Sequence, residues 1–297
     1  MGTAGGTRRV AGGVLSVVAR AGGSPMAARA WQRSDGVIEA RIRSPEPEAA
    51  HERLRFMLAL DADHAPFLRQ ARRDPLLREA AWRHAGLRPM RLGTVAHALV
   101  KAVVGQLVSG SEAMLLHRAV VGRCAPSLDG LRLPPTAFEV AAMAPAEAVG
   151  LGLAGRRAAT LSRAARTLDL DRLAAEPPAR VAARIQRERG LGPWSTGVIG
   201  LYGLGRYEHG LVGDLGLMRL WAAERGAWPA PEETAELLEP YGEWAGLASL
   251  YLLRHPLAAR HGPGAWRDRR TERVRASGRT PADRLGPAGH GRAGGTA

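Results

Sequence analysis

The sequence predicts an α+β protein that is mainly helical, with a small antiparallel sheet near its amino-terminal end. Between residues 8 and 43, short stretches with strand-like residues are separated by Gly-Gly-Ser-Pro and Ser-Asp-Gly turns. From Pro47 onward, most stretches have the apolar spacing of α-helices and are interrupted by proline and glycine. A chain of 297 residues is long enough to bury a sizeable core in one large or two smaller domains.

The individual elements follow from these patterns in chain order. Three stretches are expected to form the sheet: GVLSVVAR, MAARAWQ and GVIEARIR. Helices are expected over residues 47–60, twice within 61–86, over 95–109 with Thr94 as the N-cap, and over 109–124, 153–168, 177–189 and 241–256. The helix over 241–256 is apolar almost all round, so we expect it to be buried.

Composition and patterning divide the chain into four parts. Residues 1–7 are predicted to be disordered, residues 8–88 to form an N-terminal α/β domain, and residues 89–261 to form a helical domain. Residues 262–297 combine arginine with glycine, proline, threonine and alanine and have no apolar periodicity, so we expect a disordered basic tail.

The charge balance indicates a polyanionic partner. Lysine and arginine number 42 against 28 acidic residues, which gives a net charge of +14 and favours nucleic-acid binding. Lys101 is the only lysine, as a GC-rich coding bias would produce, but such a bias does not explain the surplus over acids.

No apolar run is long enough to span a membrane. Arg8-Arg9 and the stretch after them resemble an export signal interrupted by glycine, and we expect a cytoplasmic, nucleoid-associated protein.

The single cysteine, Cys124, excludes several classes of site. An intrachain disulfide framework, a cysteine-ligated iron–sulfur cluster and a zinc ribbon all require more than one thiol.

The stretch RERGLGPWSTG predicts a helix, a tight hairpin and a second helix. Gly190 stands where a helix ends in a left-handed turn, Leu191 can fill the core, and Gly192 permits close approach. Pro193 suits the first position of the next helix, and the backbone amides there, with the Ser195 hydroxyl, could receive a phosphate. The alternative is a plain helical corner in which the glycines serve only the turn.

Asp214 is the one carboxylate between Glu208 and Arg219, in a stretch after this hairpin that is otherwise uncharged. Beside a DNA backbone an acid is repelled by phosphates, so its presence there would indicate a chemical role. The alternative is that Asp214 only caps the helix that begins LGLMRLW, and both roles are compatible.

At these residues the chain resembles the helix–hairpin–helix DNA glycosylases. GLGPWSTG and VGDLGL resemble their glycine- and proline-rich hairpin and catalytic aspartate, and LVKAVVGQLVS and EPYGEWAGLASLYLLR resemble further segments of the bacterial DNA-3-methyladenine glycosylase II type. The resemblance covers roughly residues 10 to 260. It implies two helical subdomains that form a DNA-binding cleft, preceded by the small sheet domain.

The resemblance also implies roles for individual residues. Asp214 falls on the catalytic carboxylate, and Gln106 and Leu107 fall on the loop that enters the gap left by a flipped base. The hairpin positions that contact DNA correspond to Gly190, Leu191, Gly192 and Ser195. Hairpins of this kind can hold a monovalent cation through backbone carbonyls, and the resemblance implies no other cofactor or metal.

Three features bear on the substrate pocket. Trp194 occupies the position at which bifunctional relatives carry a Schiff-base lysine, which argues against lyase activity. Where the family pattern has two pocket aromatics, this chain has Val198 and Leu250, with Tyr251 beside the latter. Trp194, with Tyr251 or Trp244, would then stack on the base. His97 and His117 could line the cleft, although a position at the edge of the core is the simpler expectation.

Together these observations predict a monofunctional DNA glycosylase of base excision repair. It would act as a monomer and hydrolyse the N-glycosidic bond of damaged, alkylated bases flipped out of double-stranded DNA. Two alternatives are open: a glycosylase for uracil, hypoxanthine or an oxidised purine, and a non-catalytic DNA-binding protein with the same hairpin.

Overall fold

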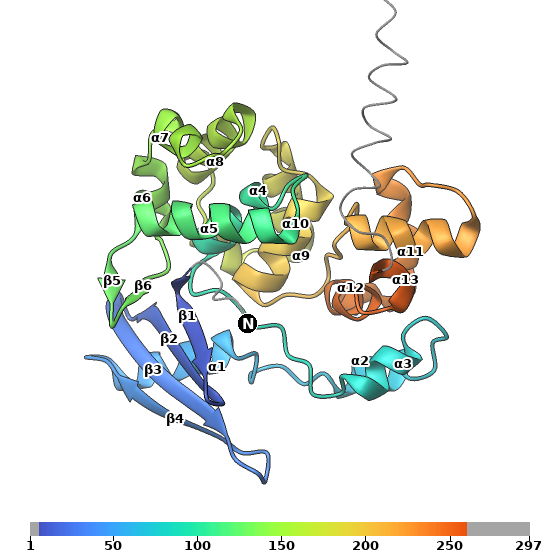
Figure 1. Ribbon diagram of the computed structural model, residues 1–297, viewed down its shortest axis with the longest axis horizontal. Coiled ribbons are helices and arrows are strands. Elements are labelled where there is room, and N and C mark those ends of the chain that lie inside the picture. The colour runs from blue at the N-terminus through green and yellow to red at the C-terminus, as the bar shows by residue number, and fades with distance from the viewer. Residues whose placement is uncertain (1–5, 260–297) are drawn as a thin grey trace, which may run out of the picture. The chain divides into compact units, whose positions relative to one another are not determined.

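The computed structural model describes residues 6–259 and begins with a four-stranded antiparallel sheet in the order β1-β2-β3-β4 (Figure 1). The strands are β1 (Arg8–Ala11), β2 (Val14–Ala21), β3 (Ser24–Gln32) and β4 (Ile38–Arg43). Paired glycines with positive φ, Gly12-Gly13 and Gly22-Gly23, form the first two turns, since this backbone conformation is strained for other residues. The predicted sheet is confirmed, and β1 is an additional strand too short for the alternating pattern to indicate.

Helix α1 (Pro47–Met57) covers one face of the sheet. Val17, Met26 and Ala28 of the sheet pack against Leu54 and other apolar residues of α1, and this small core is separate from the main one. A short hairpin, β5 (Ser127–Leu128) and β6 (Leu131–Arg132), packs on the opposite face through an apolar cluster around Val18. Its Asp-Gly turn is a usual hairpin signal, so the sequence contained the information for this element.

The remaining elements are helical. They are α2 (Ala65–Ala71), α3 (Arg78–Arg83), α4 (Val95–Val104), α5 (Gly110–Cys124), α6 (Ala137–Ala142), α7 (Pro145–Gly150), α8 (Gly155–Thr167), η2 (Arg172–Ala175), α9 (Pro178–Arg187), α10 (Pro193–Ile199), η3 (Gly200–Leu204), α11 (Leu215–Arg225), η4 (Pro231–Leu237), η5 (Glu239–Trp244), α12 (Ala245–Leu252) and α13 (Pro256–Ala259).

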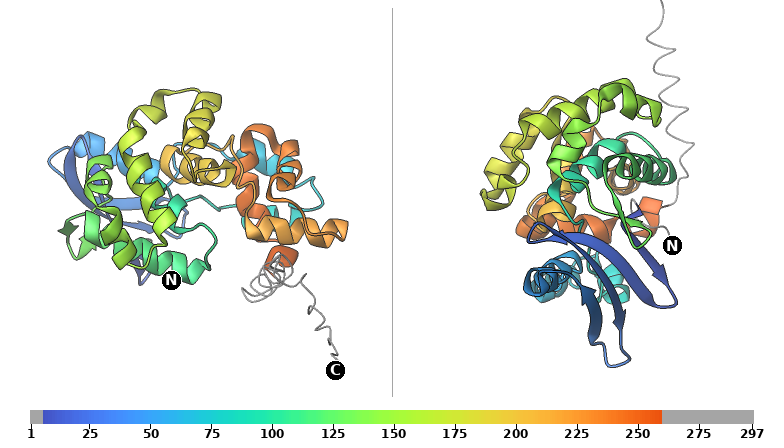
Figure 2. Two further views of the ribbon diagram at one scale, coloured as in Figure 1. Left: turned by 90° about the horizontal axis from the view of Figure 1, so that it is seen from above. Right: turned by 90° about the vertical axis from the view of Figure 1, so that its left-hand side faces the viewer.

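Helix α4 is the central element of the helical part, where it contacts α5, α8 and α10 (Figures 1 and 2). Thr94 caps it by accepting a hydrogen bond from the amide of His97, as predicted. Its apolar residues are buried on nearly all sides, because helices from both halves of the helical part pack around it. Helix α12 is also buried along its whole length, which agrees with its apolar sequence.

The hydrophobic clusters do not separate at the domain boundary expected after residue 88. Phe67 and Ala71 of α2 and Ala81 of α3 belong to the main helical core, and the ring of Phe67 lies 5.1 Å from that of Tyr251 on α12. The sheet and α1 therefore form the smaller core without α2 and α3. Helical periodicity cannot distinguish these cases, because it shows that a helix is amphipathic but not which core it joins.

Arg91 connects these parts from a buried position. Its side chain is only 2% exposed, and its guanidinium donates to Asp61 at 2.7 Å and to the Tyr207 hydroxyl at 3.1 Å. The same guanidinium packs closely against Gly205, which has a φ of 68° and where a Cβ would lie 2.5 Å from Arg91 Cζ. The segment after α1 is thereby fixed to the loop that follows η3.

Two expected segments lie partly or wholly outside the described residues. The predicted basic tail, residues 262–297, falls there, as do residues 1–5 of the predicted amino-terminal disordered segment. Thr7 is buried, and its carbonyl accepts a hydrogen bond from the amide of Val18. Within residues 6–259, no helix is long and apolar enough to cross a membrane.

Candidate active site

The predicted hairpin joins α9 to α10. Gly190 has a φ of 94°, and a Cβ there would lie 2.5 Å from Oγ1 of Thr160 on α8, so both the backbone and the packing require glycine. Leu191 is 4% exposed and fills the core, while Gly192 is the N-cap of α10 and Pro193 its first residue. The local structure is therefore the one that the sequence predicts.

The start of α10 has no side-chain cap. The first amides of a helix have no partner within the helix, and they carry the positive end of its dipole. The amides of Trp194 and Ser195 hold these positions and could receive an anion. The Ser195 hydroxyl does not point to the surface beside these amides. Its side chain is 1% exposed, and its oxygen accepts a hydrogen bond from the side-chain amide of Gln106 at 3.2 Å.

Asp214 is the N-cap of α11 and lies close to the hairpin. Its Oδ1 accepts a hydrogen bond from the amide of Gly216 at 2.8 Å, which is the capping role expected of it. Its Oδ2 accepts one from Nε1 of Trp194 at 3.1 Å. Each carboxylate oxygen has two lone-pair sites, so both oxygens can still accept a further bond. Asp214 is only half-buried and remains reachable.

Trp194 thus connects the hairpin to the carboxylate. Its indole is half-buried, and at its far edge Cη2 packs against the end of α4, where a Cβ on Gly105 would lie 2.9 Å away. Glycine at 105 leaves room for this ring. The indole is held between α4 and the N-terminus of α11, and it fixes the orientation of the Asp214 carboxylate.

The loop between α4 and α5 is braced against the same hairpin. The Gln106 side chain donates to the carbonyl of Gly190 at 2.8 Å, and Arg157 donates to the Gln106 carbonyl at 3.0 Å. The next residue, Leu107, is 75% exposed and has a φ of 56°. Gln106 and Leu107 therefore have different roles, since the first positions the loop and the second projects from it.

Comparisons with known proteins indicate which fold this arrangement belongs to. No family model matches the chain. DNA-3-methyladenine glycosylase from Bacillus subtilis (strain 168) is 25% identical over 206 residues, which cover 66% of this chain and 68% of that protein. The structure of 3-methyladenine DNA-glycosylase from Archaeoglobus fulgidus matches with a TM-score of 0.71 at 23% identity, over 84% of this chain and 89% of that one.

A second solved structure has the same architecture. The 8-oxoguanine glycosylase/lyase from Clostridium acetobutylicum, in complex with double-stranded DNA, matches with a TM-score of 0.68 at 14% identity, over 83% of this chain and 86% of that one. The chain has the helix–hairpin–helix DNA glycosylase fold. The resemblance found in the sequence is confirmed.

The residues at which this chain departs from the glycosylase pattern lie in the core. Val198 is 2% exposed and Leu250 8%, so both fill space between helices. Tyr251 is fully buried, and its hydroxyl donates to the carbonyl of His84 at 2.9 Å. Its ring is thus not available to stack on a base. Trp244 is also occupied, because it stacks on Tyr207 at a centroid distance of 5.8 Å.

Tyr202 is an aromatic residue that interacts electrostatically with the Asp214 carboxylate, and the sequence pattern did not indicate it. Burial raises the pKa of its hydroxyl, the charges of Arg254 and Arg8 lower it, and the charge of Asp214 raises it further. Tyr202 follows Val198 by four residues, about one helical turn, and lies in the π-helical turn η3. A search for an aromatic one turn beyond the family position would have found it.

The only lysine of the chain lies over this tyrosine. The Lys101 ammonium is 4.9 Å from the centroid of the Tyr202 ring, and burial, followed by the charge of Arg8, lowers the pKa of Lys101. A base that entered beside Tyr202 would therefore meet two basic side chains.

His97 and His117 do not line the cleft of this glycosylase fold. They are 0% and 5% exposed, and their rings stack at 4.8 Å. Burial, together with the charge of Lys101, lowers the pKa of His117 to about 3. Burial also lowers the pKa of His97 well below its ordinary value. Both histidines are therefore core residues, which agrees with the expected position at the edge of the core.

Two carbonyls of the hairpin, where a monovalent cation was expected, accept hydrogen bonds from side chains. The carbonyl of Gly190 accepts from Gln106, and the carbonyl of Arg189 accepts from Arg163. Each carbonyl oxygen has a second lone pair, so the cation stays a prediction, and no step of the reaction is assigned to it. Residues 6–259 also hold no group of three or more histidine, cysteine, aspartate or glutamate side chains placed to bind a metal ion.

Proposed function

We propose that the protein is a monofunctional DNA glycosylase that starts base excision repair. It hydrolyses the N-glycosidic bond of damaged, alkylated bases that are flipped out of double-stranded DNA, and it acts as a monomer in the cytoplasm, at the nucleoid. The observation that carries the proposal is the single hydrogen bond by which Trp194 of the hairpin helix orients the Asp214 carboxylate. The 25% identical relative named DNA-3-methyladenine glycosylase supports the same function.

The hairpin supplies the first step, which is binding of the DNA backbone. A phosphate beside Gly192 can accept hydrogen bonds from the uncapped amides at the start of α10, where the dipole also favours negative charge. The net charge of +14 attracts the duplex over a longer range.

Leu107 supplies the second step, which is to hold the base outside the duplex. A stacked base exposes neither its glycosidic bond nor its faces to an enzyme, and flipping it costs a few kcal/mol. An exposed apolar side chain on a braced loop can fill the resulting gap and keep it open. Gln106 supports this loop from the hairpin side, because its side-chain amide donates to the carbonyl of Gly190.

Asp214 supplies the chemical step. Breaking the bond between C1′ of the sugar and the base nitrogen leaves oxocarbenium-like positive charge on the sugar, which a fixed carboxylate stabilises. Its oxygens can also accept a hydrogen bond from the attacking water. An alkylated purine already carries positive charge and leaves as a neutral base, so the reaction needs no strong general acid.

Trp194 limits the reaction to hydrolysis. An indole nitrogen cannot form a Schiff base with C1′, and here its N–H is engaged with Asp214. The product is then an abasic site in an unbroken strand.

One observation favours a second substrate class. Lys101 over Tyr202, with Arg8 nearby, places positive charge where the base would stack, which disfavours a cationic base and favours a neutral lesion with carbonyl acceptors. Hypoxanthine, uracil and oxidised purines belong to this class.

A panel of duplexes, each with one defined lesion, tests both candidates. Single-turnover base release is measured for 3-methyladenine, hypoxanthine, uracil and an oxidised purine, with an undamaged duplex as the control. Fastest release of 3-methyladenine supports the alkylated-base assignment, and fastest release of a neutral lesion supports the second class. Release from none of them contradicts the glycosylase function itself. Covalent trapping with borohydride, or strand cleavage without alkali, contradicts monofunctional chemistry.

A further inference from the structure

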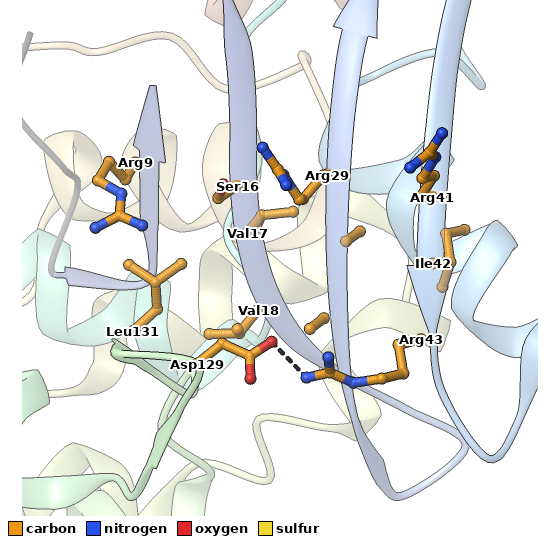
Figure 3. A pocket seen from close by; sticks show the side chains of 12 residues that line it. Arg9, Ser16, Val17, Val18, Arg29, Arg41, Ile42, Arg43, Asp129 and Leu131 are labelled. Atoms are coloured by element: carbon orange, nitrogen blue, oxygen red, sulfur yellow. Dashed lines mark hydrogen bonds and ion pairs between the residues drawn. The ribbon is translucent and has the colours of Figure 1, made fainter. Parts of the chain in front are cut away.

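The face of the sheet opposite α1 carries arginines that the proposed reaction does not use. Arg9, Ser16, Arg29 and Arg41 are successive cross-strand partners on β1, β2, β3 and β4, so they form one row across the whole sheet. Arg43 lies two residues further along β4 on the same face. Figure 3 shows these side chains around a hollow of about 420 Å³, which Asp129 and Leu131 of the β5–β6 hairpin line on one side.

Most of this charge has no acidic partner in the protein. Arg43 is paired with Asp129, but among residues 6–259 no carboxylate lies within 4.0 Å of the guanidinium of Arg9, Arg29 or Arg41. Glu39 lies two residues before Arg41 on β4, and it pairs with Arg33 instead. Like charges directly opposite one another destabilise a sheet, as for Arg29 and Arg41. The fold therefore carries a cost that a bound anion would offset.

The chemistry of the row fits phosphate. A guanidinium offers a planar fork of N–H donors that matches phosphate oxygens, and Arg9, Arg29 and Arg41 are exposed. From β1 to β4 the row crosses three strand spacings, about 14 Å in total, which is close to the roughly 12 Å width of the major groove of DNA. It can therefore reach phosphates on both sides of that groove.

A single strand fits this face less well than a duplex. Proteins that bind single strands stack successive bases on several aromatic side chains. Among the strand residues on this face Trp31 is the one aromatic, and it is half-buried with Arg41 over its ring at 5.9 Å, so successive bases would find no series of rings to stack on. Contacts with the backbone alone suffice for duplex DNA.

We infer that this arginine row (Arg9, Arg29 and Arg41) is a second DNA-binding surface, which holds backbone phosphates of duplex DNA outside the candidate active site. Binding here is independent of sequence and of damage, because guanidinium–phosphate contacts do not depend on the bases. It retains the protein on undamaged DNA.

The test compares two double variants that lose the same charge. Arg29→Gln/Arg41→Gln removes two members of the row, and Arg78→Gln/Arg83→Gln removes two exposed arginines of α3 as the matched control. Binding of the full-length protein to an undamaged 30-base-pair duplex is measured by fluorescence anisotropy at several salt concentrations. Thermal unfolding of both variants establishes that they fold.

If the row binds phosphates, its variant binds more weakly than the control, and the slope of log K against log salt becomes shallower by about 1.8, or 0.9 for each lost contact. Affinities and slopes equal to those of the control overturn the inference. A 30-residue poly-glutamate peptide is the other arm. If it binds the wild type as tightly as the duplex does and loses affinity only in the row variant, the surface belongs to an acidic protein partner and the DNA assignment is wrong.

Discussion

The side-chain amide of Gln106 donates to the carbonyl of Gly190 at 2.8 Å, across 84 residues of the chain. This bond joins the loop that carries Leu107 to the hairpin that would bind the backbone. The two parts that we propose to touch DNA are thus fixed relative to each other before DNA binds, which would reduce the ordering that binding requires.

Replacing Gln106 should slow base release more than it weakens binding to undamaged DNA. Gln106→Ala removes the bonds to Gly190 and Ser195, so the Leu107 loop loses its support. We expect about a fivefold lower single-turnover rate, since a hydrogen bond contributes roughly 1 kcal/mol. Ser195→Ala retains the bond to Gly190 and is the control. A wild-type rate in Gln106→Ala contradicts the positioning role.

Asp214→Asn should abolish base release while DNA affinity stays the same or improves. Asparagine is as good an N-cap as aspartate, so α11 should remain capped. The charge that stabilises the oxocarbenium-like sugar is lost, and so is its repulsion of phosphates. Such electrostatic contributions are usually worth about 10²-fold or more in rate. If more than about a tenth of the single-turnover rate survives, Asp214 does not have this role.

Trp194→Phe tests the indole N–H separately from the ring. Phenylalanine keeps an aromatic ring at position 194 but lacks the indole atoms that reach Gly105, and it cannot donate to Asp214. We expect base release to fall by about fivefold, because the carboxylate loses a hydrogen bond that contributes roughly 1 kcal/mol and fixes its orientation. An equal loss of rate in Gly105→Ala, which displaces the ring, would point to packing instead of the hydrogen bond.

Leu107→Ala should lower base release while affinity for an undamaged duplex stays near that of the wild type. The side chain acts only after the base has left the stack, so the intact duplex does not detect its loss. Both duplexes are compared by anisotropy, and turnover is measured on the lesion duplex. Equally weakened binding to both duplexes, with unchanged turnover, would show that Leu107 does not hold the gap open.

Acid should destabilise the fold through the stacked histidine pair. Burial lowers the pKa of His117 from an ordinary 6.5 to about 3 and that of His97 in the same direction. Between the folded and unfolded pKa values of these histidines, the unfolded chain binds more protons than the folded one. The stability that they contribute is therefore present above pH 6.5 and is lost as the pH falls. As the pH falls below 6.5, each of these histidines should lower the free energy of unfolding by about 1.4 kcal/mol per pH unit. Urea unfolding of His117→Gln from pH 7 to pH 4 should show a correspondingly shallower pH dependence than the wild type. Parallel curves contradict the assignment.

The sequence predicted the elements of the site better than their contacts. Gly190, Pro193 and the Asp214 cap could be predicted because each follows from local backbone chemistry. The bond from Trp194 to Asp214 could not, because it depends on how α10 and α11 pack. For the same reason the bond from Gln106 to the hairpin could not be predicted, although Gln106 was expected on the loop that enters the gap.

Burial of aromatic residues was the hardest feature to predict. Tyr251 and Tyr202 both follow apolar stretches, yet one lies in the core and the other near Asp214. An apolar helix indicates only that it is buried, and α12 is apolar all round, so its sequence does not distinguish a pocket wall from the core. The choice of which core α2 and α3 join was likewise decided by tertiary packing.

The left-handed backbone conformation of Leu107 lowers the stability of the fold, while its side chain serves the proposed activity. A φ of 56° costs a non-glycine residue roughly 1–2 kcal/mol, and three-quarters of the side chain is in water. Leu107→Gly should therefore raise the melting temperature even as it removes the wedge. Selection for thermal tolerance alone, in the laboratory or in nature, would favour the loss of this leucine, so an engineered variant that gains stability at residue 107 should be assayed for repair before it is kept.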